Sequence, residues 1–286
     1  MKSNHQEKNQ AYNSLIAGSV SGMTSLLMCH PIDILRTKIQ LSNSSKINYS
    51  LGSIENYNLK TVLQTYYKGF LPPLLAQSVY KSVIFSTNHF SIKYLFNGNS
   101  SDFSTFISGF LSGTLNSFVV SPVELIRSRQ IINDKKQGVF ETINLLIKEA
   151  GALSLWRTLP LTILRDGPGV SIYLYTFNSL KVAIEKRKHN ATKLSLIDRI
   201  FAGGMAGVAF WAYALPIDTI KTILESTKNE KSKSNQISIF RNIKEVYQKF
   251  GLAYLYRSWP VAIGRGLPGA AITLTTYDTI MEYLNG

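Results

Sequence analysis

The chain alternates between long apolar runs without charge and polar segments rich in Lys, Ser and Asn. Three of the apolar runs, 12–29, 103–120 and 200–215, hold 16 to 18 residues each and contain no Asp, Glu, Lys or Arg. Each run continues into a segment with a proline, and the combined length is enough for a helix that crosses a bilayer. This pattern predicts an all-α membrane protein.

A short motif with proline, an acid and a base follows each of these runs. It has the form Pro-x-acid-x-x-base, and its prolines at 31, 122 and 216 recur after 91 and 94 residues. Three copies at a nearly constant period indicate a triplicated chain. We expect a polar tail over 1–10 and repeats over 11–97, 98–191 and 192–286. Because a proline inside a helix removes a hydrogen bond, we also expect helix kinks at Pro31, Pro122 and Pro216.

Each repeat predicts an apolar helix, a polar loop with a short amphipathic helix, and a second apolar helix. The first repeat should form helices over about 12–40 and 70–96, and the second an amphipathic stretch near 139–150. Glycines one turn apart in the first helix of each repeat should let neighbouring helices approach closely. Six spans put both termini on one side. The loop after the first helix of each repeat is rich in Lys and Arg, which favours the interior side of the membrane for these loops. The termini are then expected on the opposite side.

The net charge and the cysteine count limit which kinds of binding partner and bound group we expect. With 31 Lys and Arg against 17 Asp and Glu, the net charge of +14 favours anionic partners such as lipid headgroups or anionic substrates. The basic residues are scattered over loops and form no continuous stripe, so we expect no nucleic-acid partner. Cys29 is the only cysteine, which excludes an internal disulfide, and the four histidines lack metal-ligand spacing. We expect neither a metal nor a cofactor.

The acid and base of each proline motif lie three residues apart, so each pair occupies one face of a helix. Charges at membrane depth are costly unless they are paired or hydrated. Three matched pairs are therefore expected to face a common interior and to close one mouth of a central cavity; intrahelical pairs at the membrane surface are the alternative. We call these six the gate residues: Asp33, Arg36, Glu124, Arg127, Asp218 and Lys221.

The chain resembles the mitochondrial carrier family over essentially its whole length. The three proline motifs carry the resemblance, together with the aromatic–base dipeptides Tyr67-Lys68, Trp156-Arg157 and Tyr256-Arg257. It implies a six-helix bundle with pseudo-threefold symmetry in the mitochondrial inner membrane, which works by alternating access around one site. It also implies both termini toward the intermembrane space, cardiolipin as a lipid partner and function as a monomer. When the matrix mouth is shut, it implies the pairs Asp33–Arg127, Glu124–Lys221 and Asp218–Arg36.

The family's second gate, an aromatic-acid-x-x-base motif on each even helix, is eroded in this chain. Asp278 and Lys181 remain without evident partners, and Lys93 lies one position late. We expect the cytoplasmic mouth to close weakly, by packing and hydrogen bonds. Thr158 and Ser258 also stand where the family has glycine, which weakens the case for lipid-headgroup binding at those helix starts.

The adjacent charges Arg165 and Asp166 fall near the middle of the fourth predicted helix, a depth at which charges indicate function. A self-satisfied ion pair is the alternative. The resemblance implies substrate contacts at Gln77, Arg165, Asp166 and Arg265, and an Arg–acid pair on this helix is similar to the amino-acid and carnitine carriers. A zwitterion needs a cation for its carboxylate and an anion for its ammonium, which Arg265 and Asp166 supply.

Two further residues refine the substrate prediction. Trp211 offers a ring face to an ammonium group, and a membrane-facing Trp is the alternative. Lys81 stands where ornithine-type carriers have a glutamate, which disfavours a strongly cationic substrate.

The sequence thus predicts a transporter of a small zwitterion of the amino-acid or carnitine/acylcarnitine type. The alternatives are a carrier of an anionic carboxylate or nucleotide-derived metabolite, with Lys81 as an extra cation, and a scaffold that retains the fold without transport. A membrane enzyme is disfavoured, because no metal cluster, nucleophile–base pair or phosphate loop is recognisable.

Overall fold

Six long helices dominate the computed structural model, which describes residues 2–41, 66–67, 69–99, 101–132, 138–187, 194–226, 248 and 251–285. The long helices are α1 (Lys2–Leu41), α3 (Leu71–Phe90), α4 (Asp102–Ile132), α6 (Leu159–Arg187), α7 (Leu196–Ser226) and α9 (Trp259–Asn285). A π-helical turn, Ser91–Leu95, extends α3. A short helix, α5 (Val139–Ala150), and a 3-10 turn, Ala152–Trp156, connect α4 to α6. The described residues contain no strand, which agrees with the predicted all-α class.

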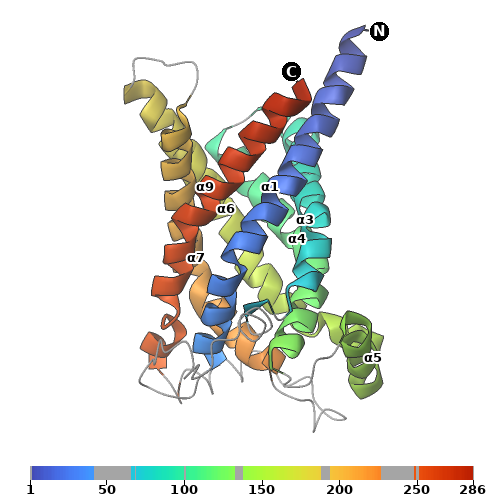
Figure 1. The fold of residues 1–286 in the computed structure, drawn as a ribbon. Helices are drawn as coiled ribbons and strands as arrows, with labels where there is room; N and C mark the ends of the chain where they lie inside the picture. Colours follow the sequence, from blue (N-terminus) through green and yellow to red (C-terminus); the bar gives the residue numbers. More distant parts are fainter. Residues whose placement is uncertain are drawn as a thin grey trace, which may run out of the picture.

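The six helices form a closed ring in chain order. Each contacts the next, and α9 packs against α1 to complete the circle. Both termini lie at one end of the bundle, where Asn13 Nδ2 donates to Leu284 O at 3.3 Å (Figure 1). At the other end, close to α5, α7 also contacts α1 and α4 across the ring. The first helices of the three repeats, α1, α4 and α7, therefore converge at the end that carries the three proline motifs.

The helix bounds differ from the predicted ones mainly at their polar ends. Helix α1 begins at Lys2, so the helix also includes the polar segment that we expected to be a tail. Helix α6 continues to Arg187, so the helix ends in a charged segment that includes Glu185, Lys186 and Arg187. Polar residues can extend a helix beyond its apolar stretch because its backbone hydrogen bonds are internal. The prolines at 31, 122 and 216 lie inside α1, α4 and α7.

Helix α5 has the predicted amphipathic character and the predicted bounds. Leu146 is buried with Leu125 and Ile126 of α4, whereas Phe140 is 83% exposed. The corresponding amphipathic helices of the first and third repeats fall at positions outside the described residues. A short helix with one apolar face buried and further exposed aromatics is typical of a membrane interface.

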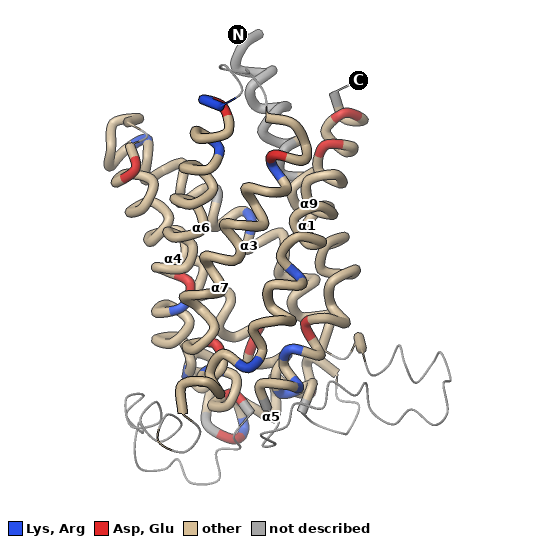
Figure 2. The backbone as a smooth tube through the Cα atoms, turned by 90° about the vertical axis from the view of Figure 1, so that its left-hand side faces the viewer, with Lys and Arg blue, Asp and Glu red and all other residues tan. Residues whose placement is uncertain are grey.

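Two of the described helices, α4 and α7, are long and apolar enough to cross a membrane, with mean hydropathies of 1.3 and 1.6 over their most apolar stretches. The other long helices carry more polar residues. Figure 2 shows a dense group of charged residues in the lower part of the bundle, near α5, below long stretches of uncharged helix. This is the region where α1, α4 and α7 converge.

The predicted close approach at the paired glycines is present in the second repeat. A Cβ on Gly113 would lie 2.1 Å from Asp166 O, and one on Gly109 would lie 2.8 Å from the Cα of Ser171, so α4 and α6 touch backbone to backbone. In the third repeat, Gly204 makes the close contact, with Leu267, and a Cβ on Gly207 would meet nothing within 4 Å.

Candidate functional site

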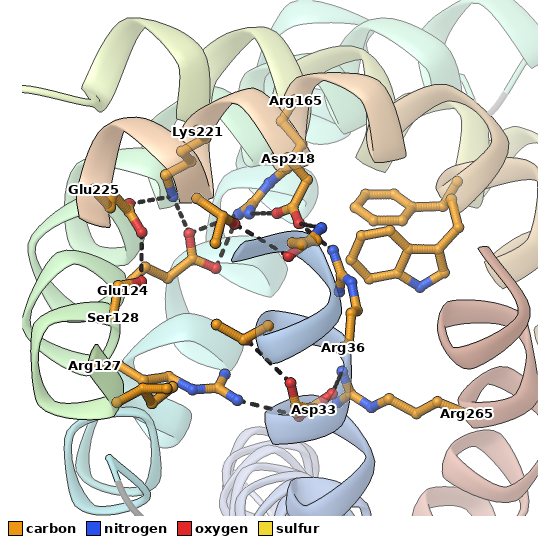
Figure 3. Close-up of a pocket in the computed structure, with 16 residues that line it drawn as sticks. Asp33, Arg36, Glu124, Arg127, Ser128, Arg165, Asp218, Lys221, Glu225 and Arg265 are labelled. Atoms are coloured by element: carbon orange, nitrogen blue, oxygen red, sulfur yellow. Dashed lines mark hydrogen bonds and ion pairs between the residues drawn. The ribbon is translucent and has the colours of Figure 1, made fainter. Parts of the chain in front are cut away.

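The gate residues meet where α1, α4 and α7 converge, and they form three ion pairs between helices (Figure 3). The pairs are Arg36–Asp218, Lys221–Glu124 and Arg127–Asp33. These are the three pairings that the family resemblance implies, and the role of these residues in closing one mouth of the cavity stays a prediction. Each pair joins a base of one of the helices α1, α4 and α7 to an acid of another, so these three helices are linked around the bundle axis.

The three pairs differ in strength. The carboxylate of Asp33 lies 3.7 Å from Arg127 Nη2, beyond hydrogen-bond distance, whereas Arg265 Nη1 of α9 lies 2.7 Å from the other oxygen of Asp33. Arg265 and Arg127 therefore share one acid. Since direct contact strengthens an ion pair steeply, the contact between α1 and α4 is the weakest of the three.

Arg165 of α6 contacts three carboxylates. Its Nε and Nη2 donate to Asp166 at 2.6 and 3.0 Å, its Nη1 donates to Asp218 at 2.7 Å, and its Nη2 also donates to Glu124 at 3.1 Å. Arg165 and Asp166 are each 6% exposed. The predicted substrate residue Arg165 is thus also hydrogen-bonded to two of the gate residues, Asp218 and Glu124.

Trp211 lies beside the gate with one ring face against Arg36. The Arg36 Cζ is 3.8 Å from the ring centroid, within the range of a cation–π contact, and Phe210 packs edge-on to the indole at 4.9 Å. Trp211 therefore faces the interior rather than lipid in this conformation. The ring face that we assigned to an ammonium group is occupied by Arg36, one of the gate residues.

The gate surrounds a polar cavity of about 260 Å³. Three of the predicted substrate residues line it: Arg165, Trp211 and Arg265. Gln77 lies instead against α1, where a Cβ on Gly22 would come within 2.5 Å of its Nε2, and Lys81 is half-buried on α3. Neither lines the cavity, and neither does Asp166, whose carboxylate accepts both of its hydrogen bonds from Arg165, so a role of these three residues in substrate binding stays a prediction.

Two side chains that we did not single out from the sequence support the gate. Gln40 Nε2 donates to Asp218 at 2.8 Å, and its oxygen accepts from Thr222 at 3.2 Å. Glu225 lies 3.3 Å from Lys221, which also pairs with Glu124. Both follow the proline of their repeat by nine residues, so a comparison of the repeats beyond the motif would have identified them.

Glu225 is 2% exposed and satisfies its carboxylate with neighbouring hydroxyls. Ser128 donates to it at 2.6 Å and Thr158 at 3.2 Å. Arg157, in the turn before α6, donates to the carbonyls of Leu224 and Glu225 at 3.2 and 2.9 Å. Burial lowers the pKa of the Arg157 guanidinium, although arginine keeps its proton in proteins. A second layer of hydrogen bonds thus lies beyond the gate.

The opposite end of the bundle contains a pair that the sequence did not predict. Arg199 of α7 donates to both oxygens of Asp278 in α9, at 3.0 and 2.6 Å. Asp278 therefore has a partner, contrary to our reading of the eroded second gate. Lys181 lies 3.9 Å from Glu185 of its own helix, and Lys93 lies in the π-helical turn with its Nζ 5.4 Å from the ring centroid of Tyr94.

No cluster of three His, Cys, Asp or Glu side chains suited to a metal ion occurs in the part of the chain that the structure describes. The site is instead a balanced array of acids and bases. Such an array can bind charged groups and exchange partners.

Comparison with known proteins agrees with this architecture. A family profile described as mitochondrial carrier protein matches residues 7–99, 98–188 and 192–286. The glutamate/glycine mitochondrial carrier ymc1 of Schizosaccharomyces pombe is 28% identical, over 96% of each chain. The mitochondrial carnitine carrier of Saccharomyces cerevisiae and the mitochondrial citrate transporter C of Aspergillus niger are each 27% identical. They cover 96% of this chain, and 87% and 89% of their own lengths.

Proposed function

Because this chain belongs to the mitochondrial carrier protein family, whose members are transporters, we propose that it moves a small zwitterionic metabolite across the mitochondrial inner membrane. The observation that carries the proposal is the arrangement around Arg165. This arginine contacts Asp166 and two gate acids at the edge of a cavity that Arg265 also lines. The substrate would be an amino acid or a carnitine-type compound.

The chemistry of the cavity fits a molecule with one positive and one negative group. Five bases and four acids line it: Arg36, Arg127, Arg165, Lys221 and Arg265 against Asp33, Glu124, Asp218 and Glu225. A nearly balanced wall favours a ligand of low net charge, because a multiply charged anion would leave several acids facing it. The volume of about 260 Å³ lies just below the range of sites for drug-sized ligands, which favours a small molecule.

Substrate binding and gate opening are coupled in this proposal through shared side chains. A substrate carboxylate attracts Arg165 and Arg265, and its ammonium group takes a place beside Asp166. Glu124, Asp218 and Asp33 then each lose a cationic partner, so the ring of ion pairs weakens as the substrate binds. A ligand shifts a conformational equilibrium by its difference in affinity for the two states, and here the difference arises from exchanged ion pairs.

The alternative is a carrier of an anionic carboxylate or nucleotide-derived metabolite. It is favoured by the surplus base of the cavity wall and by Lys81, which makes no ion pair with any described residue. A relative named for citrate transport is consistent with it. A third possibility is a scaffold that keeps the fold but transports nothing.

The test is uptake by the purified protein in liposomes, with labelled amino acids, carnitine esters, carboxylates and nucleotides. We expect uptake of a zwitterion, and we expect Asp166→Asn to lower it by about tenfold or more, since a hydrogen bond to a charged group contributes about 1.5–3 kcal/mol. Asp102→Asn, at the start of α4, is the matched control. Unchanged zwitterion uptake by Asp166→Asn would rule out Asp166 as the contact of the ammonium group. Uptake of simple anions alone supports the anionic alternative, and no uptake of any compound supports the scaffold.

The proposal extends to the membrane setting. The Lys- and Arg-rich loops that follow the odd helices favour the matrix side for those loops and the intermembrane space for both termini. We further propose that a single chain is the working unit, because it contains all three repeats, and that cardiolipin is its lipid partner.

A further inference from the structure

The prolines inside α1, α4 and α7 each leave one backbone carbonyl without a hydrogen-bond donor in its own helix. Proline has no N–H, so the carbonyl four residues earlier receives no hydrogen bond from its own helix. In a bilayer, no water is present to replace that bond. In the three helices that carry the gate residues, the carbonyls concerned are those of Leu27, Phe118 and Ala212.

Each of these carbonyls accepts a hydrogen bond from an aromatic side chain. The bonds are Tyr67 Oη to Leu27 O at 3.2 Å, Trp156 Nε1 to Phe118 O at 2.9 Å and Tyr256 Oη to Ala212 O at 3.1 Å. The three donors hold the same position in their repeats, as the aromatic residue of the aromatic–base dipeptide just before the even helix. Donor and acceptor types thus recur together in all three repeats.

A fourth case occurs beside the substrate site. Pro168 lies inside α6, and the carbonyl of Leu164, four residues earlier, accepts from Tyr213 Oη of α7 at 2.8 Å. Leu164 directly precedes Arg165. The carbonyl of Gly264, which precedes Pro268 in α9 by four residues, receives no such side-chain bond from the described residues. The donors therefore accompany the prolines next to the gate and Arg165, and not every internal proline.

We propose that Tyr67, Trp156 and Tyr256 are positioning residues for the gate. The gate acid and base follow each proline by two and five residues, so the direction in which they project depends on the helix geometry at the proline. The aromatic donor replaces the lost hydrogen bond and fixes that geometry. The same hydrogen bond joins the first helix of the repeat to the segment just before its second helix, so that the two helices of one repeat move as a unit. This inference does not depend on the identity of the substrate.

The only cysteine of the chain provides a local measurement. Cys29 is 1% exposed and lies between Leu27 and Pro31. In the full-length protein in detergent, we expect Tyr67→Phe, which removes only the hydroxyl, to accelerate labelling of Cys29 by N-ethylmaleimide roughly fivefold, the change expected for one typical hydrogen bond. Tyr66→Phe, which removes a hydroxyl one residue earlier, and Tyr256→Phe, which acts on α7, should leave the rate unchanged.

Restoring the missing N–H gives a specific rescue. In a Pro31→Ala background, residue 31 can donate to Leu27 O itself, so adding Tyr67→Phe should no longer accelerate labelling. Tyr67→Trp should behave as the native residue, because the second repeat uses Trp at this position. Equal labelling of Tyr67→Phe and Tyr66→Phe overturns the proposal, and so does an acceleration that persists unchanged in the Pro31→Ala background.

Transport kinetics supply a second readout. With a substrate that the native protein takes up in the liposome panel, Trp156→Phe should lower the maximal rate severalfold and leave KM unchanged, whereas Trp156→Tyr retains a donor and the native rate. Equal rates for Trp156→Phe and Trp156→Tyr contradict the positioning role. Failure of the panel itself counts against the proposed function and leaves the Cys29 measurement valid.

Discussion

Arg165 contacts carboxylates that come from α4, α6 and α7, and its role depends on all three. The adjacent Asp166 could be foreseen from the sequence, because the two charges are neighbours in the chain. The contacts with Glu124 and Asp218 could not, because they depend on how three helices pack. An arginine that we assigned to the substrate therefore also stabilises the gate, and its replacement should affect the conformational equilibrium as well as binding.

Gly113 offers a test at the scale of one residue. Because a Cβ there would lie 2.1 Å from the backbone oxygen of Asp166, Gly113→Ala should separate α4 from α6 and lower the free energy of unfolding in detergent by about 1–3 kcal/mol. Gly207→Ala is the control, since its Cβ meets nothing within 4 Å. Equal thermal stability of the two variants would show that the close contact is unimportant.

Helices α7 and α9 are joined near the termini by Arg199 and Asp278, in a pair whose side chains are 32% and 38% exposed. The bidentate geometry is favourable, but partial exposure limits what the pair contributes. Our expectation that the cytoplasmic mouth closes weakly, by packing and hydrogen bonds, stays a prediction. In the present conformation Asp278 is bound to a neighbouring helix and not to a residue across the bundle.

A double-mutant cycle measures this contact between helices. Arg199→Gln and Asp278→Asn should each destabilise the protein slightly, and the two changes should couple by about 0.5–1 kcal/mol. The pair Lys181–Glu185, which lies on one helix at a distance of 3.9 Å, should couple by about 0.3 kcal/mol. Additive effects of Arg199→Gln and Asp278→Asn on thermal unfolding would mean that the contact contributes nothing.

The bundle as a whole is linked by ion pairs of unequal strength, which sets an order for its opening. Asp218 interacts with Arg36, Arg165 and Gln40, all of them buried. Asp33 lies 3.7 Å from Arg127 and also pairs with the partly exposed Arg265. We expect the ring of helices to open first between α1 and α4 on the side of the gate.

Replacement of the two acids should separate these contacts. Asp218→Asn removes the ion-pair partner of the buried Arg36 and one of the three carboxylates that contact Arg165, and it should cost about 3 kcal/mol or more of stability. Asp33→Asn leaves bases that water can reach and should cost about 1 kcal/mol. Thermal unfolding in detergent gives both values, and a larger loss for Asp33→Asn would reverse the proposed order.

The sequence by itself determined the all-α class, the three repeats and the family, and it located the six charged residues that pair between helices, because periodic apolar runs and a triplicated motif are local patterns. It also contained, in positions nine residues after two of the prolines, the signal for Gln40 and Glu225. Only the tertiary structure decided that Arg165 contacts gate acids, that Trp211 faces Arg36 and that Asp278 pairs with Arg199. These contacts join residues tens of positions apart in sequence, so they depend on which helix faces meet, and chain order alone does not specify that.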